Sequence, residues 1–136
     1  MLRQPGIQSD DVLACVTTLS FDIVGIDLYL PLIQGARLVV LSTTTATDGF
    51  ALAEALEHYN ATILQATPVT WRLLIETGWQ GKPDLKMLCC GEPLPYQLAQ
   101  QLLARGRELW NGYGPTETTI YSSLNPIYPT DELISI

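Results

Sequence analysis

The sequence has few basic residues and few cysteines, and it has no long apolar run. Seven Lys and Arg residues stand against fourteen acidic residues, so the net charge is −7. Nucleic acids and anionic membranes attract clustered positive charge, so this composition argues against both as main partners. No apolar stretch approaches the roughly 20 residues that span a bilayer, and residues 1–6 lack the apolar core of a secretory signal.

The three cysteines and the single histidine form no recognisable reactive or metal-binding set. Cys89 and Cys90 are adjacent, which suits neither a disulfide framework nor a metal-ligand spacing, and a reducing cytoplasmic setting fits best. His58 lies on an expected helix and is predicted to be a surface residue. There is no glycine-rich phosphate loop ending in Lys-Ser/Thr and no Gly-x-Gly-x-x-Gly after the first expected strand. The best-known nucleotide-binding loops are therefore excluded.

What is present is a large apolar fraction, with 47% apolar and 15% charged residues in a chain of 136. This length suits one domain over 1–136, with an ordered core at about 11–123. Both ends look cut rather than finished. A large core, or faces that normally pack against a neighbouring domain, would explain the apolar excess.

Short apolar runs alternate with stretches of helical periodicity. The alternation predicts an α/β fold with an open, mostly parallel sheet of about five strands and helices on both faces. A polar loop is expected at 43–47 and a short further strand at 120–122. In the helix that Thr67 is expected to cap, we expect Val69, Leu73 and Leu74 to face inward. The expected strands are 12–17, 37–41, 62–65, 85–89 and 108–111, and the expected helices follow Ser20 or Asp22, Asp48, Thr67 and Pro95.

The carboxyl ends of these strands should share one edge, where open parallel sheets bind ligands. Asp22 follows the first strand, where it could cap the next helix or pair with a ligand ammonium. Gly91, Glu92 and Tyr113 could sandwich a planar ring, because glycine lets backbone approach and tyrosine stacks. Other residues at the strand ends would line the same cavity or form plain core: Gln65, Leu88, Cys90, Gly112, Ile120 and Tyr121.

The stretch 111–119 reads Asn-Gly-Tyr-Gly-Pro-Thr-Glu-Thr-Thr, a rigid turned loop followed by hydroxyls and a carboxylate. Thr116 is placed to hydrogen-bond a phosphate, and Glu117 could bind Mg²⁺, which takes oxygen ligands. This stretch resembles the signature of the adenylate-forming enzymes, in the form typical of nonribosomal peptide synthetase adenylation domains. Phe21-Asp22, Leu28 to Ala36, Thr67-Pro68 and Cys90 to Leu94 resemble further motifs of those domains in the same order.

The resemblance implies a flavodoxin-like subdomain and a role for each matching residue. Asp22 would bind the α-ammonium of an amino acid. Tyr113 would stack on adenine opposite the backbone of Gly91 and Glu92, with Asn111 near the purine edge. Thr116 and Glu117 would be the catalytic residues, Thr116 on the phosphate and Glu117 on Mg²⁺. The specificity pocket would consist of Ile23, Ile26, Gln65, Leu88, Cys90, Gly112, Ile120 and Tyr121.

The reaction that the resemblance implies is attack of an amino acid carboxylate on the α-phosphate of ATP, which gives aminoacyl-AMP and pyrophosphate. The acyl group would then pass to a phosphopantetheine thiol on a carrier protein. The pocket set resembles those for glycine, alanine or another small neutral amino acid. No tightly bound cofactor is expected on the chain itself.

The family's phosphate loop, ribose-binding Thr-Gly-Asp motif and catalytic lysine have no match in the sequence. We therefore hypothesise an excised subdomain that folds, packs against the rest of an adenylation domain and does not catalyse alone. Three alternatives stay open. One is a piece of an acyl- or aryl-CoA ligase, against which Asp22 argues, because a substrate without an ammonium would leave that charge unpaired. The second is a non-catalytic flavodoxin-like binding domain, and the third is a purely structural unit.

Overall fold

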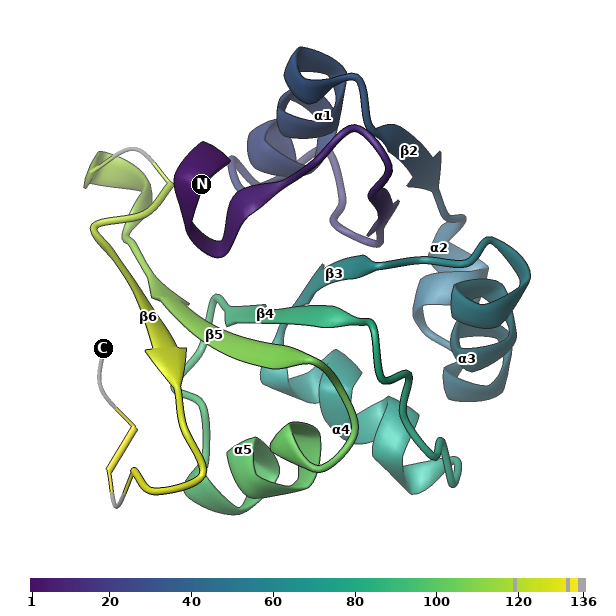
Figure 1. Cartoon of the computed structure of the whole chain (residues 1–136), viewed down its shortest axis with the longest axis vertical. Coiled ribbons are helices and arrows are strands. Elements are labelled where there is room, and N and C mark those ends of the chain that lie inside the picture. The colour runs from purple at the N-terminus through teal and green to yellow at the C-terminus, as the bar shows by residue number, and fades with distance from the viewer. Residues whose placement is uncertain (119, 132, 135–136) are drawn as a thin grey trace.

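An open sheet of six strands, in the order β2-β1-β3-β4-β5-β6, forms the centre of the molecule (Figure 1). The structure, a computed structural model, describes residues 1–118, 120–131 and 133–134. Neighbouring strands are parallel, except that β6 runs antiparallel to β5. The predicted α/β class and mostly parallel sheet are confirmed, and the sixth strand corresponds to the short further strand expected after the first five. The strands are β1 (Val12–Cys15), β2 (Arg37–Val40), β3 (Ile63–Ala66), β4 (Lys86–Cys90), β5 (Glu108–Tyr113) and β6 (Ser123–Ile127).

Helices cover both faces of the sheet. On one face α1 (Val24–Gln34) packs against β1 and β2. On the other face α4 (Pro68–Glu76) lies between α3 (Gly49–His58) and α5 (Tyr96–Leu103). Within the described residues no helix is long and apolar enough to cross a membrane. The described residues also form three short helical turns, η1 (Leu2–Gly6), α2 (Thr43–Ala46) and η2 (Thr116–Thr118).

Local signals set several helix ends where the sequence predicts them. The Asp48 carboxylate accepts hydrogen bonds from the backbone N–H groups of Phe50 and Ala51, at 2.9 and 3.0 Å, and caps α3. Pro68 occupies the first position of α4, where a missing N–H costs nothing. Gly35 ends α1 in the left-handed conformation, with φ 72°.

The expected polar loop at 43–47 is wrong, because residues 43–46 form the short helix α2. The Ser42 hydroxyl accepts a hydrogen bond from Thr45 N at 3.1 Å and so starts this helix. The expected inward position of Val69 is also wrong, because its side chain is 60% exposed. The buried stripe of α4 runs through Pro68, Trp71 and Leu74 instead. Val69 lies beside this stripe, rotated about 100° around the helix axis.

The last strand begins later than predicted. Residues 120–122 precede β6, and β6 pairs antiparallel with β5, so that Tyr113 lies opposite Ser123. The chain therefore reverses direction within the loop after β5. A loop that reverses direction lets β6 pair with β5 without a crossover helix.

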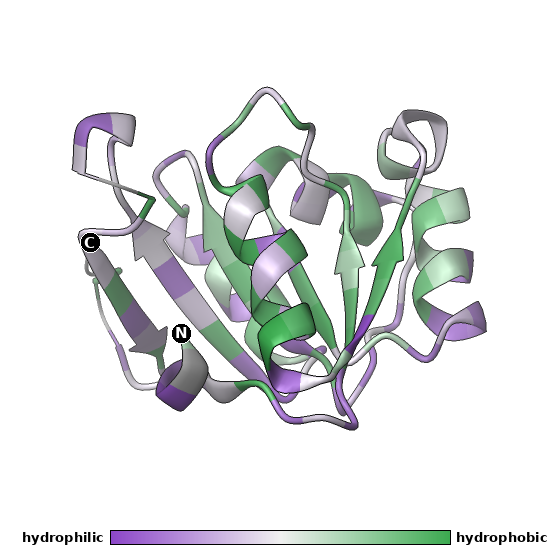
Figure 2. Cartoon of the chain, turned by 90° about the horizontal axis from the view of Figure 1, so that it is seen from above, coloured by the Kyte–Doolittle hydropathy of each residue, from purple (hydrophilic) through white to green (hydrophobic). Residues whose placement is uncertain are grey.

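Side chains alternate between the two faces along the central strands, as the twofold period of a strand requires. In β3, Leu64 and Ala66 join the core beneath α3, α4 and α5, whereas Ile63 faces α1. In β4, Met87 and Cys89 take the first face. Coloured by hydropathy, the central strands are mostly apolar, while the helices carry polar residues on part of their surface (Figure 2). Ile7 and Ile127 also belong to the buried core.

A buried ion pair ties together the edge of the sheet at which the parallel strands begin. Lys86 Nζ lies 3.0 Å from Asp11 Oδ2 and donates a second hydrogen bond to the Gly6 carbonyl, also at 3.0 Å. The Thr62 hydroxyl donates to Asp11 Oδ1 at 2.7 Å. Burial raises the pKa of Asp11, but these hydrogen bonds and the Lys86 charge outweigh it and hold that pKa below its usual value. These contacts hold β1, β3 and β4 together at the edge where they begin, which is remote from their carboxyl ends.

Candidate functional site

The strand order reverses between β1 and β3, which is the position where open α/β sheets form a ligand crevice. The chain leaves β1 toward α1 on one face and leaves β3 toward α4 on the other. The loops after β4 and β5 emerge at the same edge, because β1, β3, β4 and β5 are parallel. The predicted gathering of strand ends is therefore present.

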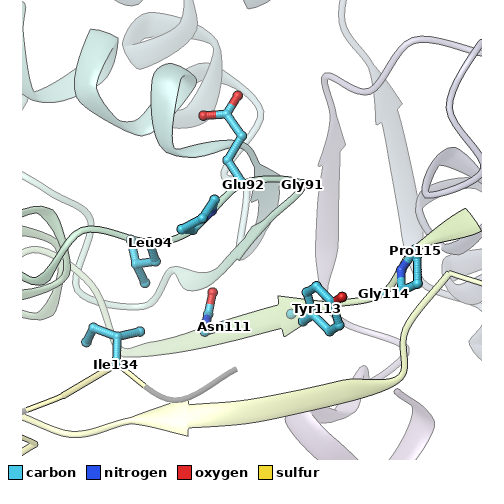
Figure 3. Close-up of a pocket in the computed structure, with 10 residues that line it drawn as sticks. Gly91, Glu92, Leu94, Asn111, Tyr113, Gly114, Pro115 and Ile134 are labelled. Carbon is cyan, nitrogen blue, oxygen red and sulfur yellow. The ribbon is translucent and has the colours of Figure 1, made fainter.

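A cavity of about 360 Å³ opens between the loop after β4 and the end of β5. Figure 3 shows Asn111 and Tyr113 on β5 facing the segment that carries Gly91 and Glu92. Gly91 has φ 86°, a conformation that glycine adopts without strain. The Glu92 carboxylate is directed away from Asn111, so the backbone of that loop forms the wall (Figure 3).

Four residues predicted to bind a nucleotide thus line one cavity, although they come from two separate segments. Tyr113 presents a ring that is 50% exposed, as a stacking platform requires. Two apolar wall residues, Leu94 and Ile134, were missed by sequence reasoning. Leu94 follows a proline in a loop, and Ile134 lies far along the chain, so neither carries a local signal.

Thr116 and Glu117 lie just outside this cavity, in the short helix η2. Both side chains are exposed. The loop is closed by Thr118, whose backbone N–H and hydroxyl donate to the Pro115 carbonyl at 2.9 and 3.0 Å. In the part of the chain that the structure describes, no three His, Cys, Asp or Glu side chains converge on a metal-sized site. A divalent cation here would have one carboxylate of this chain, Glu117, and ligands from elsewhere.

The predicted specificity residues of β3, β4 and β5 share the face of the sheet that α1 covers. Leu88 packs in the core cluster of that face, and Gln65 lies beside it in register. Cys90 follows two residues after Leu88 and pairs with Gly112. Gln65, Leu88 and Cys90 are all buried. The 360 Å³ cavity and this second group of residues therefore lie on the two sides of β5, and Gly112 borders both.

A further cavity, of about 410 Å³, brings together predicted pocket residues from distant parts of the sequence. Ile26 comes from α1, and Ile120 and Tyr121 come from the loop before β6. Met1 and residues 122–124 complete its wall. Ile26, Ile120 and Tyr121 are thus brought together as predicted, whereas the half-buried Ile23 precedes α1 and does not line this cavity.

Asp22 lies in the turn that leads from β1 into α1, and its side chain is exposed. Its Oδ1 accepts a hydrogen bond from the adjacent Ile23 N–H at 2.8 Å. The residue at the helix N-cap position is Ile23, and no side chain caps α1. Asp22 is therefore not the N-cap residue, and its second carboxylate oxygen has no hydrogen-bond partner among the described residues.

The structure reveals a functional candidate that sequence reasoning missed, Asp27. This side chain is fully buried. Its Oδ2 accepts from the Thr17 hydroxyl at 2.7 Å, and its Oδ1 accepts from Gln65 Nε2 at 2.8 Å. The signal was present: Asp27 lies on the same side of α1 as the buried Val24 and Pro31, so an acid interrupts an apolar stripe.

Tyr121 completes the buried polar group. Its hydroxyl donates to Gln65 Oε1 at 2.6 Å. Its ring lies directly over Gly112, where a Cβ atom would stand 2.5 Å from Tyr121 Cε1. Glycine at 112 is therefore required by the close approach of this ring. Ile120, just before it, has φ 68°, which is an unusual conformation for a β-branched residue and marks a tightly constrained turn.

Burial controls the charge of this group. Burial raises the pKa of Asp27 to about 7, although hydrogen bonds from Thr17 and Cys15 favour the carboxylate. Burial likewise raises the pKa of Cys90 to about 11 and that of Tyr121 well above its usual value. The thiol and the phenol are therefore neutral near pH 7. Asp27 is the one member of the group that titrates close to neutrality.

The model of the family described as AMP-binding enzyme matches residues 2–135. The chain belongs to this family. The match includes every residue that lines the two cavities except Met1.

The curated relatives that the chain resembles are nonribosomal peptide synthetases and their hybrids. The chain is 41% identical over 131 residues to the PKS-NRPS hybrid synthetase acdB of Aspergillus candidus, a match that covers 96% of the chain. It is 42% identical over 118 residues to the dimodular nonribosomal peptide synthase of Bacillus subtilis, covering 87% of the chain. The chain spans only 5% of the length of each relative.

Solved structures agree with the fold. A four-domain holo nonribosomal peptide synthetase bound to AMP and glycine superposes with a TM-score of 0.92 and 38% identity, over 94% of this chain and 10% of that one. The Vibrio cholerae adenylation domain AlmE, in complex with glycyl-adenosine-5'-phosphate, gives a TM-score of 0.87 and 25% identity, over 99% of this chain and 26% of that one. The chain is thus part of an adenylation domain.

Proposed function

We propose that this chain supplies the amino acid pocket and the adenine wall of an adenylation domain that activates a small α-amino acid. The amino acid carboxylate attacks the α-phosphate of ATP, and aminoacyl-AMP and pyrophosphate result. The acyl group then passes to a phosphopantetheine thiol on a carrier protein. The observation that carries the proposal is the placement of the predicted pocket and nucleotide residues on the two sides of β5.

The nucleotide side fits a purine. The 360 Å³ cavity has a half-exposed aromatic ring on one side and a glycine-containing backbone segment on the other. In the proposed complex Tyr113 stacks on adenine, the backbone of Gly91 and Glu92 covers its other face, and Asn111 lies near the purine edge. The exposed Thr116 hydroxyl donates to a phosphate oxygen.

The charged groups of the substrates are assigned to the two exposed carboxylates. Asp22 binds the α-ammonium through the carboxylate oxygen that Ile23 N–H does not occupy. Glu117 fits a Mg²⁺ site, because this cation usually takes only one or two carboxylates beside phosphate oxygens and water. When bound, the cation neutralises phosphate charge, while the chain's own contribution is to position the reactants.

The base of the proposed pocket is filled by protein side chains, which supports a substrate with a small side chain. Tyr121 rests on Gly112 and bonds to Gln65, so aromatic and amide groups occupy the space above β4 and β5. Glycine or alanine is therefore the proposed substrate. Two structural relatives bind glycine or glycyl-adenosine phosphate, which supports the same choice. The buried free thiols are compatible with a reducing cytoplasmic setting, which stays a prediction.

Amino-acid-dependent exchange of pyrophosphate with ATP, measured on the adenylation domain that carries this sequence, tests the proposal. We expect glycine or alanine to exceed valine and phenylalanine at least about tenfold in kcat/KM, the order expected when a pocket excludes larger side chains. Asp22→Ala should raise the KM for glycine by about 10- to 100-fold, the range for losing a hydrogen bond to a charged group.

Asp10→Asn removes an exposed acid before β1 and should leave the exchange unchanged. Faster exchange with benzoate than with any amino acid would identify an aryl acid ligase instead. Nucleotide binding without exchange for any acid would identify a non-catalytic binding domain.

A further inference from the structure

A chain of hydrogen bonds connects α1, β3 and the loop before β6 behind the proposed amino acid pocket. The Thr17 hydroxyl and Gln65 Nε2 both donate to the Asp27 carboxylate, at 2.7 and 2.8 Å. The Tyr121 hydroxyl donates to Gln65 Oε1 at 2.6 Å. Asp27 is fully buried and Gln65 is 1% exposed, so water does not compete for these bonds. The Asp27 carboxylate, the Gln65 amide and the Tyr121 hydroxyl thus each have a hydrogen-bond partner within the group.

The carboxylate determines which way the Gln65 amide points. A glutamine amide presents donors at one end and an acceptor at the other, whereas an ionised carboxylate only accepts. While Asp27 is ionised, Gln65 turns its Nε2 toward α1, and its Oε1 then accepts the hydrogen bond from the Tyr121 hydroxyl. Without Asp27, nothing on α1 fixes the orientation of the Gln65 amide. The Tyr121 hydroxyl then has no acceptor held in a fixed position.

The bond between Tyr121 and Gln65 crosses over β4. Gln65 is paired with Leu88 in the sheet register, and Cys90 is paired with Gly112. Tyr121 rests on Gly112 in β5, so its hydroxyl reaches Gln65 in β3 only by spanning the strand between them. The Tyr121 ring and the Gln65 amide together therefore extend across β3, β4 and β5 at the carboxyl ends of these strands.

We propose that Asp27 is a positioning residue for substrate selection, which holds the Gln65 amide and Tyr121 in place as the closed floor of the amino acid pocket. This inference rests on the proposed function and adds to it a residue that touches no substrate. The pocket excludes larger side chains because its floor is anchored to α1. Loosening the anchor lets Tyr121 move and opens room for a longer side chain.

A merely structural network would behave differently. If Asp27 only stabilised the fold, its loss would lower activity toward all amino acids by the same factor. If Asp27 positions the floor, its loss must change the ratio between a larger and a smaller amino acid. The ratio of kcat/KM for valine to that for glycine therefore separates the two roles.

The experiment measures this ratio by pyrophosphate exchange on the adenylation domain that carries this sequence. For Asp27→Ala we expect the valine-to-glycine ratio to rise about tenfold or more, because the floor loses its anchor and glycine loses its closed pocket. For Asp27→Asn we expect a ratio within about threefold of wild type. The substituted amide can accept from Gln65 and donate to the Thr17 hydroxyl, so the sense of Gln65 is kept.

Tyr121→Phe provides a second and independent variant. It removes only the hydroxyl that donates a hydrogen bond to Gln65, and it leaves the ring over Gly112. The valine-to-glycine ratio should therefore rise by about threefold, as for the loss of one hydrogen bond. This variant decides the matter if Asp27→Ala does not fold. Asp11→Asn is the matched control, because Asp11 is equally a buried carboxylate in a hydrogen-bonded group but lies at the opposite edge of the sheet. Its ratio should equal that of the wild type.

An unchanged ratio in Asp27→Ala, or in Tyr121→Phe where the alanine variant is insoluble, overturns the inference and leaves the proposed function intact. A wild-type domain that prefers valine or phenylalanine over glycine overturns both the small-substrate proposal and the closed floor. A raised ratio in Asp27→Ala together with a wild-type ratio in Asp27→Asn supports the inference. The same raised ratio in Asp11→Asn would also overturn it, because a remote loss of stability would then suffice.

Discussion

Asp27 is a buried acid without a cationic partner. Among the residues that the structure describes, no Lys, Arg or His nitrogen lies within 4.0 Å of its carboxylate. Its partners are neutral, namely the Thr17 hydroxyl and the Gln65 amide. Hydrogen bonds compensate only part of the cost of burying a charge, which is why burial raises the pKa of Asp27 to about 7. Holding the carboxylate ionised in this place therefore lowers the stability of the fold.

This residue should give the chain a measurable pH dependence. In the folded state Asp27 keeps its proton up to about pH 7, whereas in the unfolded state it loses it near pH 3.8. Between these values the folded state binds more protons, so stability falls as the pH rises. We expect the free energy of unfolding of wild type, minus that of Asp27→Asn, to fall by an amount on the order of 4 kcal/mol between pH 4 and pH 8.

Urea unfolding of both variants at a series of pH values measures this difference, and groups common to the two variants cancel. Cys15 and Cys90 face Asp27 from β1 and β4 and do not contribute, because burial raises the pKa of each to about 11. Tyr121 also stays neutral throughout. A difference that is flat over this range would show that Asp27 is ionised in the fold at little cost.

At the scale of the element, β5 separates the two halves of the site. Asn111 lines the 360 Å³ cavity of the proposed nucleotide site, while the neighbouring Gly112 carries the Tyr121 ring on the other side. Successive side chains of a strand point to opposite faces, so one strand can serve two ligands. A change at either position should therefore affect one half of the site more than the other.

Gly112→Ala should disturb the amino acid side selectively. The new Cβ would stand 2.5 Å from Tyr121 Cε1, so the ring must move away from Gln65. We expect a loss of about 1–3 kcal/mol in stability, as for other overpacked sites, together with weaker discrimination against valine. Urea unfolding and pyrophosphate exchange measure the two effects, and the affinity for AMP should change less than the affinity for glycine.

Gly25→Ala is the matched control for this prediction. Its Cβ would lie 3.7 Å from Ile120 Cδ1, an ordinary contact, and it lies within a helix, where alanine is favoured over glycine. This variant should be as stable as wild type or slightly more stable. Equal losses from both substitutions would argue against the close approach of Tyr121 to β5.

What the sequence could predict at this scale depended on how local the cause was. The cap at Asp48 and the proline at the start of α4 were predictable, because each acts through neighbouring backbone. The strand ends were predictable because parallel topology gathers them at one edge. The role of Asp27 was not, because its burial and its bond to Gln65 depend on residues 38 positions apart that only the folded sheet brings together.

At the scale of the whole molecule, large apolar side chains are exposed on α1 and β2. Tyr29, Leu32 and Ile33 of α1 are each about two-thirds exposed, and so is Val40 of β2. α1 and β2 pack together and lie at one end of the sheet (Figure 1). The spacing of Tyr29, Leu32 and Ile33 puts them on neighbouring turns of one helix side, and soluble monomers rarely expose such a group of large apolar side chains unless another surface covers it. The proposal that the chain packs within an adenylation domain gives this surface a partner.

The 136-residue chain on its own should therefore self-associate through α1. We expect sedimentation velocity at micromolar concentration to show dimers or larger species for the wild-type chain. The double change Leu32→Glu and Ile33→Lys should return it to a monomer without altering its helical circular dichroism, because both side chains are mostly exposed.

Val69→Glu is the matched control. Val69 is exposed to a similar degree, but it lies on α4 beside Thr70, Arg72 and Glu76, so removing it should leave the association unchanged. Monomeric wild-type chain would mean that this apolar surface is too dispersed to bind a second copy, and equal effects of both changes would place the contact outside α1.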